Sequence, residues 1–120
     1  MLSKAELESY RVEESQVFTI DKIVQTPLGL ESHPKALVGV VHEVQPFVKT
    51  VHHDNGYKEY TQYYSMLVGA DIIPFELMVF YDPKEPGGVW SENRTSSIQS
   101  EIDALYRKYG ACIFKPRRLR

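Results

Sequence analysis

His52 and His53, followed by Asp54, form the first group of side chains in the sequence that could bind a metal. Imidazole and carboxylate groups are common ligands of zinc and other transition metals. The surrounding segment, "VHHDNGYKEY", is however typical of two strands joined by an Asn-Gly turn, and neighbours on a strand point to opposite faces. Because no Cys or third His stands nearby at a metal-site spacing, we expect a turn here, with no metal or other cofactor.

His42 and Glu76 are the residues best suited to general acid-base catalysis. His42 shares one face of an apolar segment, "LVGVVHEVQ", with three valines, and such a histidine is more often a hydrogen-bonded core or interface residue than a catalyst. Glu76 interrupts an apolar face and must be paired, exposed at a cleft or shifted in pKa. A small hydrolase or isomerase is therefore one hypothesis, which requires that both side chains open into one pocket.

The segment "EPGGVWSENR" is our candidate for a binding site. Residues 82 to 95 have the Pro, Gly and Asn content of a long loop, in which two glycines permit motion and Trp90 offers a flat apolar surface. The alternative is a solvated connection in which Trp90 folds back into the core. We expect a ligand-binding cleft lined by Tyr64, Glu76, Trp90 and Arg94.

Asn55-Gly56 predicts a type I′ turn in which both residues have positive φ. This turn sets a register in which Val51 opposes Tyr60 and Phe47 opposes Tyr64. Both faces of the resulting ribbon are rich in aromatic and β-branched side chains, so each face needs a cover. One cover is the protein's own helices, and the second is another subunit. We therefore expect a homodimer with an interface at Phe47, Val51, Tyr60 and Tyr63.

Charge is distributed unevenly along the chain. Residues 107 to 120 carry six Lys or Arg and no acid, whereas residues 1 to 106 carry eight bases against sixteen acids. The acidic body is repelled by phosphate backbones, which counts against broad nucleic-acid binding. The basic tail at 115–120 could contact phosphate or an acidic partner, or could be solvated or paired with its own body. Its bases are Lys115, Arg117, Arg118 and Arg120.

A length of 120 residues predicts one domain, spanning 1–120. Ser3 and Glu6 form a capping box, so a helix should begin at residue 4 and run to about Glu14. Strands are predicted at 16–26, 36–53 with a break at Pro46, 57–68, 72–81 and 111–115, and a second helix at 96–109. We expect an α+β fold in the order α-β-β-β-β-α-β. Its mainly antiparallel sheet of about five strands should have the second helix packed across it and the N-terminal helix at an edge or face.

The composition, 42% apolar and 25% charged, is typical of a soluble globular protein. No apolar run is long enough to cross a bilayer, and "MLSKAELESY" lacks the apolar region of a signal peptide. Cys112 is the single cysteine, so no intrachain disulfide can form and we expect a cytoplasmic protein. Our leading hypothesis is a non-catalytic homodimeric module that binds a small ligand or a protein partner. Nucleic-acid binding through the tail is a further alternative.

Overall fold

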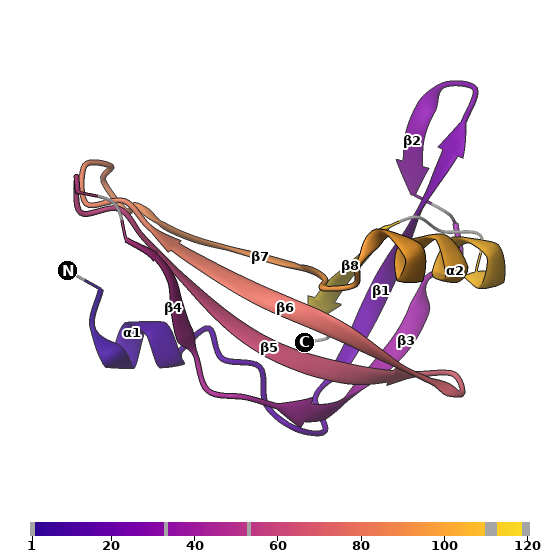
Figure 1. Ribbon diagram of the computed structural model, residues 1–120, viewed down its shortest axis with the longest axis horizontal. Coiled ribbons are helices and arrows are strands. Elements are labelled where there is room, and N and C mark those ends of the chain that lie inside the picture. Colours follow the sequence, from indigo (N-terminus) through magenta and orange to yellow (C-terminus); the bar gives the residue numbers. More distant parts are fainter. Residues whose placement is uncertain (1, 33, 53, 110–112, 119–120) are drawn as a thin grey trace.

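The computed structural model describes residues 2–32, 34–52, 54–109 and 113–118 (Figure 1). Within these ranges the chain forms eight strands and two helices. In chain order the elements are α1 (Lys4–Glu8), β1 (Val17–Thr26), β2 (Gly29–Ser32), β3 (Leu37–Val44), β4 (Val48–His52), β5 (Lys58–Val68), β6 (Asp71–Tyr81), β7 (Val89–Thr95), α2 (Gln99–Tyr109) and β8 (Ile113–Arg118). The predicted α+β class with an antiparallel sheet is confirmed, but the sheet is larger than the predicted five strands.

The sheet curls so that β8, which pairs with β1, approaches the edge strand β7. Its order is β2-β1-β3-β5-β6-β7, with β4 paired to β5 and β8 paired to β1. β7 runs close to β8, although the described residues form no ladder between the two strands. The curl gives the sheet a concave and a convex face (Figure 1). Across the described residues, no helix combines the length and the apolar character that a membrane crossing requires.

The hydrophobic core lies on the concave face. β5 and β6 are paired along their whole lengths, from Lys58 opposite Tyr81 to Val68 opposite Asp71. Because alternate residues of a strand share a face, every second residue of β6 points into the core, as the sequence predicts. The buried cluster is Leu2, Val12, Phe18, Ile20, Val41, Tyr64, Met66, Val68, Ile73, Phe75, Leu77 and Val79.

Segment 82–95 was predicted to be a loop, and no strand was predicted at 27–35, where we expected a loop between two strands; both predictions are wrong in part. β2 forms a hairpin with β1, and β7 pairs with β6 from Phe75 opposite Thr95 to Tyr81 opposite Val89. The β7 sequence "VWSENRT" is largely polar and has low intrinsic strand propensity. Its strand conformation comes from hydrogen bonds to the edge of β6, a tertiary effect that local sequence does not show.

The predicted β4–β5 register is also wrong by one residue near the turn. Val51 opposes Glu59, not Tyr60, and a bulge lies between Lys49 and Val51. Gly56 has a φ of 86°, whereas Asn55 does not have positive φ, so the turn is not type I′. The side chain of Val51 therefore lies on the opposite face from the one predicted, since a one-residue shift reverses the faces of a strand.

α2 lies at one end of the curled sheet and is not packed across it (Figure 1). None of its residues is buried, and only Leu105 and Tyr109 contact the core cluster. Its C-terminal turn is fixed by an ion pair of 2.6 Å between Lys108 and Asp71 and by a hydrogen bond from the Tyr109 hydroxyl to Asp71. The Lys22 ammonium donates to the Tyr109 carbonyl oxygen at 3.3 Å, so this turn joins β1 to β6.

The N-terminal segment covers part of the concave face at the end opposite α2 (Figure 1). The predicted capping box of Ser3 and Glu6 is present, but α1 ends at Glu8 and not near Glu14. Residues 9–16 then pass over the sheet, where the Val12 amide donates to Gln62 Oε1 at 2.7 Å and Gln62 Nε2 donates to the Val12 carbonyl at 2.9 Å. Both residues are 0% exposed. The Gln62 side chain thus holds this segment to β5 as a neighbouring strand would.

Candidate functional site

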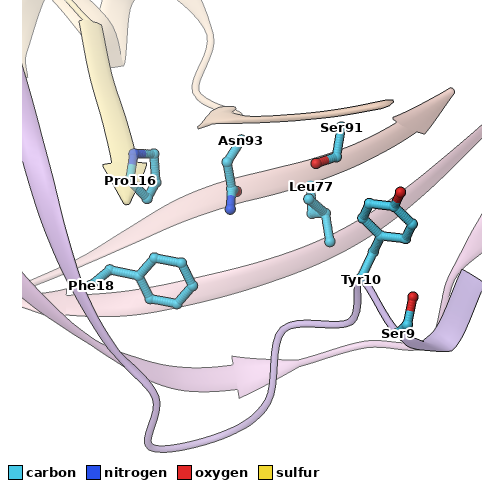
Figure 2. Close-up of a pocket in the computed structure, with 7 residues that line it drawn as sticks. All are labelled: Ser9, Tyr10, Phe18, Leu77, Ser91, Asn93 and Pro116. Carbon is cyan, nitrogen blue, oxygen red and sulfur yellow. The ribbon is translucent and has the colours of Figure 1, made fainter. Parts of the chain in front are cut away.

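A cavity of about 480 Å³ opens on the concave face, between the N-terminal segment, β1, β6, β7 and β8 (Figure 2). Its volume lies within the range typical of sites for small molecules, which is roughly 300–1,000 Å³. The lining residues are Ser9, Tyr10, Phe18, Leu77, Ser91, Asn93 and Pro116. Phe18, Leu77 and Pro116 supply apolar surface, whereas Ser9, Tyr10, Ser91 and Asn93 carry polar groups, so the lining is of mixed polarity.

Asn93 is the central polar group of the cavity. Ser91 and Asn93 are two residues apart on β7, so both side chains point to the concave face, opposite Val79 and Leu77 of β6. Figure 2 shows the Asn93 amide reaching from β7 into the cavity. Its Oδ1 accepts a hydrogen bond from the hydroxyl of Tyr64, and no hydrogen bond of its Nδ2 is formed with the described residues.

Tyr64 is held in place by two flanking aromatic rings. Its ring lies 5.8 Å from that of Phe75 at an interplanar angle of 19°, and 6.3 Å from that of Phe18 at 28°. Tyr64 is also only 4% exposed, so its orientation is fixed by packing. The hydroxyl is thereby directed at β7, where it donates to Oδ1 of Asn93 and the Nδ2 end of the amide lies on the cavity side (Figure 2).

The predicted ligand-binding residues do not line one cleft. Tyr64 lies on the concave face, whereas Glu76, Trp90 and Arg94 lie on the convex face. Arg94 Nε is 2.6 Å from Glu76 Oε1, and the Trp90 ring stacks on that of Phe80 at 5.4 Å. Glu76 therefore has the paired arrangement that a carboxylate on an apolar face requires. A shared cleft of all four residues is thus not formed, because β7 sends alternate side chains to opposite faces.

His42 and Glu76 do not meet either. His42 Nε2 lies 3.9 Å from Oε1 of its neighbour Glu43, next to a bulge in β3, and its side chain is about half exposed. Neither His42 nor Glu76 lines the cavity on the concave face, nor the two smaller cavities beside α2 and beside Tyr63. The acid-base hypothesis requires one common pocket, which these three cavities do not provide.

The other predicted sites are placed as follows. Within the described residues, no three His, Cys, Asp or Glu side chains gather as metal ligands; His53 and Cys112 lie outside those residues. The backbone of residues 113–118 forms β8, paired with β1, so most of the predicted basic tail is a strand, and Arg120 lies outside the described residues.

Among the predicted interface residues, Phe47 and Tyr60 contact the core, Val51 is half-buried and Tyr63 is exposed.

Sequence reasoning gave no binding role to Asn93, Ser91, Tyr10 or Phe18. The available signal was the alternation of Ser91 and Asn93 with charged or aromatic residues, which would have placed both on one face if residues 89–95 had been identified as a strand. The positions of Tyr10 and Pro116 in the same cavity depend on contacts between the two ends of the chain. Local pattern contains no information about those contacts.

Comparisons with protein-family models, curated proteins and solved structures gave no match.

Proposed function

We propose that this protein is a small-molecule-binding module whose ligand occupies the cavity on the concave face. The observation that carries the proposal is the Asn93 amide, which is held by Tyr64 and reaches into a cavity of about 480 Å³ lined by both polar and apolar residues. Oriented polar groups beside apolar walls can fix the position of a bound small molecule.

The surroundings of Asn93 support binding without catalysis. None of the lining side chains that the structure describes is a His, Cys, Asp, Glu or Lys. The lining hydroxyl groups have no imidazole or carboxylate among these lining residues to activate them as nucleophiles. The described part of the cavity is therefore suited to holding a ligand.

The test uses N-phenyl-1-naphthylamine, an uncharged probe whose fluorescence rises in apolar surroundings. We expect saturable binding to the wild-type protein, and loss of binding in Ser91→Phe, because the ring would occupy the cavity. Ser91 is exposed, so the substitution should leave the core intact.

The matched control is Glu92→Phe, which adds the same ring to the adjacent residue on the convex face. It should bind the probe as the wild type does. Circular dichroism should show both variants folded. Equal probe binding by the wild type and Ser91→Phe would contradict the proposed location, and no binding by the wild type would contradict the function.

For the convex face we propose a second copy of this chain as the partner. Val17 opposes Val40, Val40 opposes Leu67 and Leu67 opposes Ile72, so four apolar side chains form a row across four strands. These residues are 40%, 40%, 45% and 57% exposed, respectively. Tyr63 lies on the same face. A row without charged groups can pack against its own symmetry-related copy, and its burial is favourable.

Light scattering coupled to size-exclusion chromatography tests this assembly. The wild type should be a dimer at micromolar concentration, and Leu67→Lys should be a monomer because it places a charge in the row. Ser32→Lys, which adds the same charge to an exposed residue of β2, should remain dimeric. A wild-type protein that is monomeric at this concentration contradicts the proposal.

A further inference from the structure

The hydrogen bond between Tyr64 and Asn93 has a direct consequence for ligand chemistry. An Asn amide offers a carbonyl oxygen as acceptor and an NH₂ group with two donors. Tyr64 donates to Oδ1, which leaves the Nδ2 group of Asn93 as the end without a partner among the described residues. The cavity therefore presents hydrogen-bond donors at this point, and a ligand must offer an acceptor to use them.

The described walls of the cavity define the rest of the ligand. Phe18, Leu77 and Pro116 supply apolar surface, and the Tyr10 ring adds an aromatic wall (Figure 2). None of the lining side chains that the structure describes is charged at neutral pH. These apolar residues can pack against an apolar part of the ligand, and that burial is favourable.

We infer that the ligand has an apolar part that packs on Phe18, Leu77 and Pro116, and that it carries a carbonyl-type oxygen that accepts a hydrogen bond from Nδ2 of Asn93. This inference rests on the proposed function, since it concerns the same cavity. Asn93 acts as the polar contact to the ligand, and Tyr64 acts as a positioning residue that keeps the NH₂ group on the cavity side. A ligand without an acceptor would leave the NH₂ group of Asn93 unpaired in the occupied site, which is costly. The site therefore favours ligands that carry an acceptor.

The experiment measures displacement of N-phenyl-1-naphthylamine by 2-acetylnaphthalene and 2-ethylnaphthalene, which have similar shapes but differ in the carbonyl oxygen. The measured quantity is the ratio of the two affinities, compared between the wild type and Asn93→Leu. The different solubilities of the two compounds cancel in this comparison. Loss of one neutral hydrogen bond should weaken 2-acetylnaphthalene by about five- to tenfold. The affinity for 2-ethylnaphthalene should not fall.

Two further variants separate a contact to the ligand from a change in the fold. Glu92→Leu, on the opposite face of β7, should keep the wild-type ratio. Tyr64→Phe should reduce the preference for 2-acetylnaphthalene, because the Asn93 amide can then rotate and turn its oxygen to the cavity. If Asn93→Leu fails to fold, Asn93→Asp takes its place and should also abolish the preference, since its carboxylate would repel the carbonyl oxygen.

The outcomes distinguish this inference from the proposed function. An unchanged affinity ratio in a folded Asn93 variant would overturn the inference, while loss of probe binding in Ser91→Phe would still support the cavity as the binding site. Probe binding that does not respond to Ser91→Phe would overturn the proposed function itself.

Discussion

The substitution Gln62→Met tests how the N-terminal segment is held over the concave face. Gln62 and Val12 are both 0% exposed, and the two amide hydrogen bonds of 2.7 and 2.9 Å satisfy the Val12 N–H and C=O. Methionine has a similar length and fills the same space, but it can neither accept strongly from the N–H nor donate to the carbonyl. The substitution therefore removes the hydrogen bonds with little change in packing volume.

The expected loss of stability follows from these two groups. A buried backbone group that loses its partner costs roughly 1–3 kcal/mol, so the two together cost about 2–6 kcal/mol. This is a large share of the 5–15 kcal/mol that is typical of the free energy of unfolding of a domain. Residues 9–16 carry Ser9 and Tyr10 to the cavity, so binding of N-phenyl-1-naphthylamine should weaken as well.

Urea denaturation followed by circular dichroism measures the free energy of unfolding, and hydrogen exchange measures protection of the Val12 amide. The control is Gln99→Met on the exposed surface of α2, where the amide makes one hydrogen bond of 2.9 Å to Asp103. That variant should change stability by less than about 0.5 kcal/mol. A comparably small effect of Gln62→Met, with Val12 still protected, would refute the reasoning.

Three further predictions concern packing and pH. Gly39→Ala should lower the free energy of unfolding by about 1–3 kcal/mol in urea denaturation, because its Cβ would lie 2.8 Å from Ile20 Cδ1. The hydrogen bond to Asp71, followed by burial, raises the pKa of Tyr109 from 10.0 to about 12. Its stabilising contribution should therefore be complete below pH 10 and be lost as the pH rises toward 12. Thermal unfolding should show this loss of stability in the wild type, but not in Tyr109→Phe, which lacks the titrating hydroxyl. Trp90→Ala should cost about 1 kcal/mol on thermal unfolding, through the loss of its ring stacking, and should leave probe binding unchanged because Trp90 lies on the convex face.

The elements with strong local patterns could be predicted from the sequence. Alternation from Ile73 to Val79 predicted the buried face of β6, the capping box predicted the start of α1, and Pro46 marked the break between β3 and β4. In each case the determining interactions lie within a few residues of one another, so the pattern contains them. By contrast, α2 has an apolar stripe but no buried residue, because only part of the helix meets the sheet.

The sequence by itself determined an antiparallel α+β fold, the concave-facing residues of β6 and the absence of a second cysteine. Only the tertiary structure decided that β7 is a strand, that the sheet curls, and that Asn93 enters the same cavity as Tyr10 and Pro116. The physical reason is sequence distance. β7 depends on the edge of β6, and the cavity depends on contacts between residues near both ends of the chain, so neither leaves a periodic local pattern.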